Sequence, residues 1–214
     1  MDRARFEQLL LGALEHEMGG VEVYTTALEC AQNEELKQEW EKYLEETKEH
    51  VEVLTRVAEV FGIDPQRELP ARKIVRGLGQ ALVAAMRDAQ EAGDPGAAQV
   101  VAAECVVLAE TKDHLDWELM GECLEVLSGE EKKALQEAWE QVEPEEDEHL
   151  YHSAGWCREL WMESLGLNAV LPPPEEQKDV HTAIGAARAK NKRDELLRSK
   201  GRGKKKTKKK SSSK

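Results

Sequence analysis

Residues 13–30 read A-L-E-H-E-M-G-G-V-E-V-Y-T-T-A-L-E-C, and this stretch decides the fold because the chain repeats it. The second copy is V-V-L-A-E-T-K-D-H-L-D-W-E-L-M-G-E-C, residues 106–123, which aligns with the first without a gap. The alignment pairs Glu17 with Glu110. Each copy therefore carries one glutamate in the middle of a segment whose residues favour a helix.

A second pair of similar stretches follows the first. W-E-K-Y-L-E-E-T-K-E-H covers residues 40–50, and W-E-Q-V-E-P-E-E-D-E-H covers residues 139–149. Both are rich in carboxylates and both end on a histidine, His50 or His149. Each half of the chain thus offers one helix with a lone glutamate and one with carboxylates and a histidine. Four-helix bundles build dinuclear carboxylate metal sites from these parts.

The spacing of these residues along the chain places them at one level of such a bundle. Glu17 lies about 15 residues before the turn near Asn33, and His50 lies about 17 residues after it, so both rise a similar distance at ~1.5 Å per residue. Glu110 and His149 lie about 19 and 20 residues on either side of the second turn, near Gly129. All four helices can therefore direct these side chains to one layer.

The composition predicts an all-α protein. Aromatic residues make up 5% of the 214 residues and charged residues 34%, and no run of alternating β-branched residues competes with the helical pattern. We expect a four-helix bundle over residues 1–171, made of two helical hairpins joined by a crossover helix. A proline-led linker and a Lys-rich tail should occupy residues 172–214. The expected helices span about Arg3 to Ala31, Asn33 to Phe61, Pro70 to Ala92, Ala97 to Leu127 and Ser128 to Leu165, with a short helix between Val180 and Leu197.

The charge is divided sharply along the chain. The net charge is -13, but residues 175–214 hold 15 of the 30 Lys and Arg and only 5 of the 43 Asp and Glu. Residues 201–214 are of low complexity, and we expect them to be disordered. Three roles remain open for this basic tail: a solubility tail, docking on the acidic body, or non-specific, salt-sensitive contact with nucleic acid.

The remaining sequence features indicate a cytoplasmic protein. The first residues lack the apolar core of a signal peptide, and no apolar run reaches the length of a membrane span, so no membrane association is expected. The four cysteines form no C-x-x-C pair, and we expect them to be reduced thiols. A homodimer formed through the faces of the helical hairpins is also possible.

The repeated residues are of the types that iron and manganese prefer. Carboxylates can bridge two cations and imidazoles can cap each one, whereas burying several carboxylates without cations would be costly. Glu146 and His149 have the Glu-x-x-His spacing, which puts them on one helix face. In the first half the equivalent position before His50 is Thr47. Glu46 shares the face of His50 and is the best replacement.

Two of these stretches resemble ferritin-like proteins. The pattern Glu17-x-x-Gly20-x-x-x-Tyr24-x-x-Ala27 is similar to the first helix of rubrerythrin-type proteins, and residues 44–54, L-E-E-T-K-E-H-V-E-V-L, resemble the second helix of small bacterial stress-associated ferritin-like proteins. The resemblance covers about residues 5–166 and implies a di-iron or di-manganese centre. No rubredoxin-like cysteine knuckle is present. The implied ligands are Glu17, His50, Glu110, Glu146 and His149, with Glu46 in the sixth place, where Thr47 departs from the pattern.

These features lead to two hypotheses about function. In the first, the protein binds two Fe(II) ions, or manganese, and reacts iron with oxygen or peroxide under oxidative stress. In the second, the bundle is a metal-free structural or interaction module, because a Glu-rich helix face is usually a solvated face. Thr47 and Pro144 favour the second hypothesis.

Overall fold

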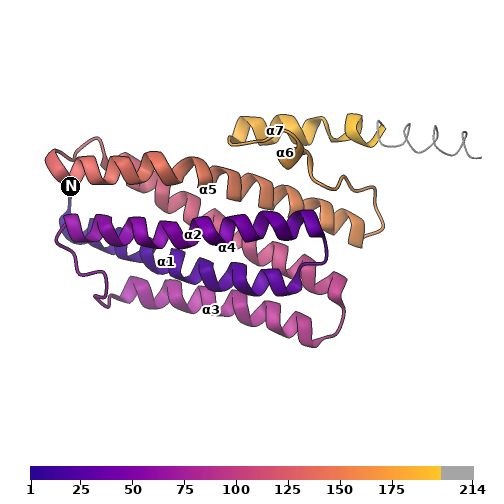
Figure 1. Cartoon of the computed structure of the whole chain (residues 1–214), viewed down its shortest axis with the longest axis horizontal. Coiled ribbons are helices and arrows are strands. Elements are labelled where there is room, and N and C mark those ends of the chain that lie inside the picture. The colour runs from indigo at the N-terminus through magenta and orange to yellow at the C-terminus, as the bar shows by residue number, and fades with distance from the viewer. Residues whose placement is uncertain (199–214) are drawn as a thin grey trace, which may run out of the picture.

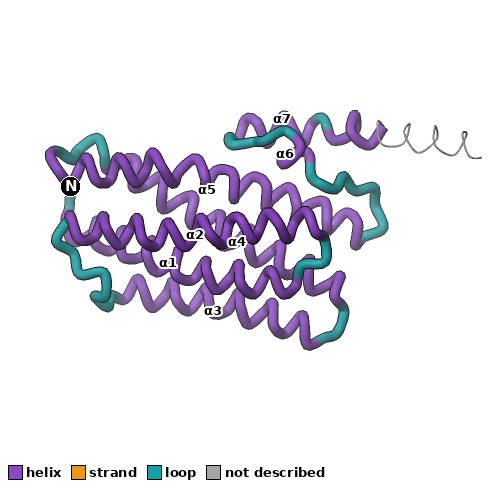
Figure 2. Tube along the Cα trace, viewed as in Figure 1, coloured by secondary structure: helices purple, strands orange, loops and turns teal. Residues whose placement is uncertain are grey.

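The computed structural model describes residues 1–198, and within that range every regular element is a helix, which confirms the all-α prediction (Figures 1 and 2). Residues 199–214, with the predicted disordered run at 201–214, lie outside the described part. Five long helices and two short ones lie wholly within residues 1–198, α1 (Arg3–Cys30), α2 (Glu34–Val60), α3 (Pro70–Glu91), α4 (Pro95–Cys123), α5 (Gly129–Ser164), α6 (Pro174–Gln177) and α7 (Ala183–Asn191), and residues 193–198 are also helical.

Capping side chains mark where helices begin, and a glycine with positive φ marks where one ends. The side chain of Asn33 caps α2 by accepting hydrogen bonds from the backbone of Glu35 at 2.9 Å and Leu36 at 3.1 Å, as the sequence predicts. Asp94 caps α4 in the same way. Gly62 adopts a φ of 67°, the left-handed conformation that commonly follows a helix. These signals place the observed bounds within a few residues of the expected ones.

The long helices α1, α2, α4 and α5 surround a common core. α1 packs on α2 and α4, and α5 packs on α4 and α2, while the crossover helix α3 covers α1 and α4 (Figure 1). Two apolar clusters fill the interior, one around Trp40 and Trp156 and the other around Leu54 and Trp117. On each of the four helices the predicted metal ligands lie between the residues of these two clusters.

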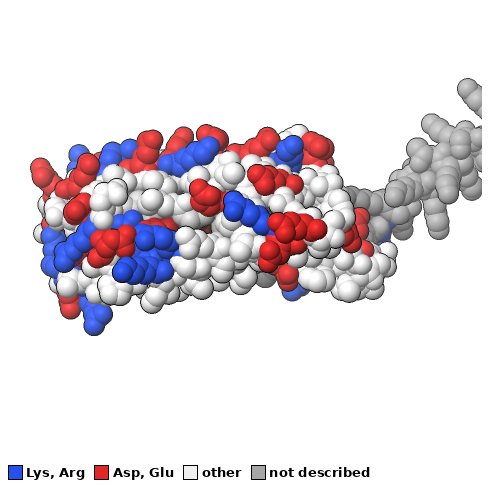
Figure 3. Space-filling model, turned by 90° about the horizontal axis from the view of Figure 1, so that it is seen from below, with Lys and Arg blue, Asp and Glu red and all other residues white. Residues whose placement is uncertain are grey.

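A buried ion pair ties α3 to α1. Arg72 donates through Nε to Glu15 Oε2 at 2.8 Å, and Arg76 donates through Nε to Glu15 Oε1 at 2.6 Å. Glu15 and Arg72 are almost fully buried. Basic and acidic side chains gather together on the face of the molecule on which α3 lies (Figure 3). Two of the cations of α3, Arg72 and Arg76, therefore hold the crossover helix against α1.

The described chain after α5 folds back onto that helix. Arg158 donates both terminal nitrogens to the Glu175 carboxylate at 2.8 Å, and Arg193 pairs with buried Glu159 at 2.8 Å. Gly155 permits this contact, because a Cβ built there would lie 2.7 Å from Glu175 Oε2. The predicted short helix is present as α7, and the division into residues 1–171 and 172–214 stays a prediction.

Two smaller expectations can be compared with the described residues. All four cysteines are free, as predicted, with Cys30 and Cys105 buried. None of the helices in residues 1–198 is long and apolar enough to cross a membrane.

Candidate metal centre

Five of the six predicted ligands converge in the layer between the two apolar clusters. They come from all four of the long helices that surround the core. Each is at most 5% exposed, so the layer is closed to bulk water. The five residues are Glu17 on α1, His50 on α2, Glu110 on α4, and Glu146 and His149 on α5.

The five side chains form two groups that share one carboxylate. In the first group, Nδ1 of His50 lies 2.9 Å from Glu146 Oε1 and 3.5 Å from Glu17 Oε2. In the second group, Nδ1 of His149 lies 3.5 Å from the same Glu146 oxygen and 3.6 Å from Glu110 Oε2. In each group the possible ligand atoms lie within 4.8 Å of one another, so each could hold a metal ion. Glu146 is the bridge between the groups.

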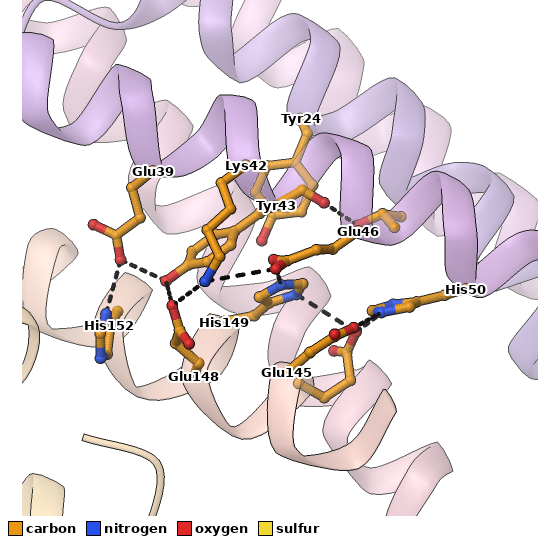
Figure 4. A network of polar contacts seen from close by, with 12 residues as sticks. Tyr24, Glu39, Lys42, Tyr43, Glu46, His50, Glu145, Glu148, His149 and His152 are labelled. Carbon is orange, nitrogen blue, oxygen red and sulfur yellow. Dashed lines mark hydrogen bonds and ion pairs between the residues drawn. The ribbon is translucent and has the colours of Figure 1, made fainter. Parts of the chain in front are cut away.

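The outer nitrogen of each histidine is held by a carboxylate from the facing helix. His50 Nε2 lies 2.7 Å from Glu145 Oε2, and His149 Nε2 lies 2.9 Å from Glu46 Oε2 (Figure 4). Metal-binding histidines are commonly oriented in this way, with the far nitrogen donating to a carboxylate. These two contacts therefore aim Nδ1 of each ring into the centre.

The inner glutamates are oriented by aromatic donors that the repeat pairs with each other. Tyr24 donates its hydroxyl to Glu110 Oε1 at 2.7 Å, and Trp117 donates Nε1 to Glu17 Oε1 at 3.1 Å. Each donor follows its own helix's glutamate by seven residues and reaches across to the other. The other oxygen of each carboxylate is left facing the centre.

The atoms that face the centre have no hydrogen-bond partner. The orphans include Glu17 Oε2, Glu110 Oε2, both oxygens of Glu146 and Nδ1 of both His50 and His149. Native proteins rarely leave buried polar atoms unpaired, since each costs about 1–3 kcal/mol. Six such atoms converging from four helices form a set of donors suited to cations.

The pKa values of the buried glutamates and histidines of this layer depart from their usual ranges. Burial raises the pKa of the Glu17 and Glu110 carboxyls above their usual range. Burial alone would lower the pKa of His50, but the Glu17 charge and the neighbouring carboxylates of Glu145 and Glu146 raise it well above its usual value. The pKa of His149 is raised well above its usual value in the same way, chiefly by Glu146. Protons therefore partly balance the charges that metal ions would balance.

Asp113 is a member of this layer that the sequence reasoning missed. It is 5% exposed, and its Oδ1 has no hydrogen-bond partner. Burial, followed by repulsion from Glu17 and Glu146, raises the pKa of Asp113 well above its usual range. The signal was available, because Asp113 lies three residues after Glu110 and therefore shares its helix face. Its repeat partner in the first half is Gly20.

Glu46 and Thr47 occupy different positions from those the ligand pattern assigns. Glu46, the predicted sixth ligand, lies outside both groups and contacts His149 rather than His50; its role as a ligand stays a prediction. Thr47 is buried and donates its hydroxyl to the Tyr43 carbonyl at 2.8 Å. Its Cγ2 would lie 3.1 Å from a Cβ placed on Gly20. A neutral threonine beside a glycine thus stands where the second half has Glu146 and Asp113.

Comparison with known proteins finds a family model for one part of the chain. A family described as a domain of unknown function, DUF892, matches residues 2–106. The match spans the first hairpin, α3 and the beginning of α4, so it contains Glu17, Glu46 and His50 and ends before Glu110. No curated protein and no solved structure matches the chain.

Proposed function

We propose that this chain is a ferritin-like four-helix bundle that binds two iron ions and oxidises Fe(II) with oxygen or peroxide, as part of an oxidative-stress response. Manganese is the alternative metal. The single observation that carries the proposal is the set of orphaned, buried carboxylate and imidazole atoms that converge from four helices. Such groups cost free energy unless cations neutralise them.

The residues fit a pair of divalent cations. Glu17 and His50 would hold one ion, Glu110 and His149 the other, and Glu146 would bridge the two. Carboxylate and imidazole donors suit iron and manganese better than soft metals. A bound Fe(II) pair would supply two electrons, one from each ion, enough to reduce oxygen to peroxide or peroxide to water with protons taken from solvent. The protein would hold the ligands in place, with Glu46 and Glu145 orienting the histidines.

The charge of the layer supports two metal positions despite Thr47. The resemblance to ferritin-like proteins implies a carboxylate at position 47, which this chain lacks. Asp113 supplies an additional buried carboxyl group in the same layer, so the layer keeps four acidic side chains beside two histidines. The four acids are Glu17, Glu110, Asp113 and Glu146.

An aerobic Fe(II) titration of the purified protein tests this proposal. We expect about two metal ions per chain in elemental analysis and an iron-dependent absorbance change complete near that ratio. The double variant Glu17→Ala with Glu110→Ala should lose both. Glu29→Ala, which removes an exposed glutamate of α1, is the matched control and should behave like the wild type. A double variant that binds and oxidises iron normally would overturn the proposal.

A metal-free interaction module is the competing function, favoured by the neutral Thr47 side chain. Elemental analysis of protein purified without chelator separates the two, because this module would contain no stoichiometric metal. The hydrogen-bond donors to Glu17 and Glu110 are an indole and a phenol, and within residues 1–198 no lysine pairs with either carboxylate, as the metal-free module would require. Non-specific nucleic-acid binding through residues 201–214, homodimer formation and a cytoplasmic location stay predictions.

A further inference from the structure

A second group of metal-binding side chains lies outside the centre, where the C-terminal segment meets α5. It consists of Glu148 on α5 with Asp179 and His181 from the segment between α6 and α7, and their ligand atoms lie within 4.8 Å of one another. His181 Nε2 lies 3.1 Å from Asp179 Oδ1, and Nδ1 of the same ring lies 3.6 Å from Glu148 Oε2. One imidazole and two carboxylates are a donor set for a divalent cation.

The segment that carries two of these donors is anchored on the bundle. Val180, which lies between Asp179 and His181, is buried, and its backbone N–H donates to His152 Nε2 at 3.2 Å. Because His152 Nε2 accepts this bond, its Nδ1 carries the proton that is donated to Glu39 at 3.0 Å. A fixed residue therefore stands between the two donors, which limits the entropy lost when both bind one ion.

A row of polar contacts leads from this group to the metal centre. Glu148 Oε1 lies 2.5 Å from Lys42 Nζ, and Lys42 lies 3.5 Å from Glu46 Oε1. Glu46 in turn contacts His149 (Figure 4). The side chains of Glu46 and Glu148 are 20% and 17% exposed, so water reaches both. The Lys42 ammonium thus already places one cation between these two carboxylates.

We propose that Glu148, Asp179 and His181 form a surface site that captures a divalent metal ion and supplies it to the centre along the seam between α2 and α5. Binding at the surface site stands independently, whereas the supply role rests on the proposed function. An ion at the surface site replaces the attraction of Lys42 for Glu148, which frees Lys42 to swing outward. The ion can then bind the carboxylate oxygens of Glu148 first and of Glu46 next, and Glu46 contacts His149.

Co(II) binding to the full-length protein tests the surface site. We expect three ions per chain in the wild type and two in the variant Asp179→Asn with His181→Ala. Asp194→Asn removes an exposed carboxylate that lies beyond α7 and should leave three. The variant Glu110→Gln with Glu146→Gln should lose the ions of the centre and keep the surface ion. Equal stoichiometry in the wild type and the Asp179/His181 variant would overturn the surface site.

The rate of filling tests the supply route. With limiting Co(II) in a stopped-flow experiment, loss of His181 and Asp179 should slow filling of the centre roughly tenfold, since acidic surface groups raise the local cation concentration. Lys42→Met removes the ammonium that competes with the metal ion for Glu46 and Glu148, so the centre should fill faster. If Lys42 served only the structure, its loss would not speed filling. A surface ion that is lost without any change in rate would overturn the route. A Glu110/Glu146 variant that keeps all of its ions would instead contradict the proposed function.

Discussion

The layer of candidate ligands receives side chains from both hairpins. The two hairpins contribute alike to its outer edge, where the far nitrogens of the histidines are held, and differently to its middle. At the edge, Glu46 and Glu145 hold the outer nitrogens of His149 and His50, each reaching to the opposite hairpin. In the middle, the second half contributes Glu146, whereas the first contributes the neutral Thr47. The same repeat therefore retains the residues that orient the histidines and differs in the residues that carry charge.

This difference indicates that one hairpin would supply the bridge for both of the proposed metal positions. Glu146 Oε1 is the oxygen that both histidines approach, at 2.9 Å from His50 and 3.5 Å from His149. Burial would raise the pKa of Glu146, but the two histidines hold it well below its usual range. The two histidines therefore favour the ionised form of Glu146, the form in which a carboxylate binds cations. On the first hairpin, Thr47 offers only a hydroxyl already bonded to Tyr43.

The largest expected effect comes from removing the bridge. Substitutions of residues that only orient a metal ligand weaken metal binding by ~10- to 100-fold. Glu146→Gln should weaken Co(II) binding at both positions by more than that, because it removes a ligand from both ions. Thr47→Val, the change at the repeat-equivalent position, should leave both affinities within about threefold of the wild type. Isothermal titration measures both. Loss of only one ion in Glu146→Gln would show that the bridge is not shared.

The next effect tests the symmetry of the edge. Glu46→Gln and Glu145→Gln should each weaken metal binding by ~10- to 100-fold, since each frees one histidine ring to rotate. The two losses should be similar in size, although Glu145 is more exposed than Glu46. Competition with a chromophoric chelator measures them. A Glu46 variant that loses one ion entirely would instead assign Glu46 the ligand role that the sequence predicts.

A third variant makes the first half resemble the second. Thr47→Glu places an additional carboxyl group in a buried layer already rich in acids, so in chelator it should lower the free energy of unfolding by about 1–2 kcal/mol. Added Mn(II) should recover that loss, because the new carboxylate gains a cation. Denaturant unfolding with and without Mn(II) measures the difference, and Thr47→Gln is the control of matching size without the charge. A loss that Mn(II) does not recover would place position 47 away from the metals.

The smallest effect concerns the proton that Asp113 carries. Because burial raises the pKa of Asp113, Glu17 and Glu110, the metal-free protein retains protons there that a bound cation displaces. Metal affinity should therefore rise with pH. On binding metal, the Asp113→Asn variant should release about one proton fewer per chain than the wild type, and its metal affinity should rise less steeply with pH. Calorimetry in two buffers of different ionisation enthalpy counts the protons, with Asp88→Asn on the exposed face of α3 as control.

Unchanged proton release in Asp113→Asn would show that Asp113 stays protonated beside the metals. It would then be a hydrogen-bond donor in the layer rather than a charge that compensates for Thr47. The charged acidic groups of the layer would be reduced to three, Glu17, Glu110 and Glu146, and these three would have to serve both metal positions.

The residues that converge could be predicted because helical spacing is regular. A rise of ~1.5 Å per residue and a period of 3.6 residues place Glu17, His50, Glu110, Glu146 and His149 at one level without knowledge of the packing. Asp113 follows from the same geometry, because it lies three residues after Glu110, but the first half has Gly20 at the equivalent position and so no matching carboxylate. A repeat reveals the residues that both halves share, but not a residue such as Asp113 that only one half contains.

The pairing of Glu46 could not be predicted in the same way. The helix period places Glu46 and His50 on one face, which suggested that both bind one metal ion. In the structure Glu46 reaches across to His149, and Glu145 reaches across to His50. The rotation of α2 and α5 about their axes decides which contacts form, and that rotation depends on the apolar side chains packed on either side of the layer.

The sequence by itself determined that the protein is helical, where its five long helices begin and end, and which residues share a level, because all three follow from local spacing and capping. Only the tertiary structure decided that Glu146 lies between both histidines and that Asp113 joins the layer. It also decided that Asp179 and His181, far along the chain, come to rest beside Glu148. These are contacts between separate helices and segments, and they depend on how the helices pack rather than on local spacing.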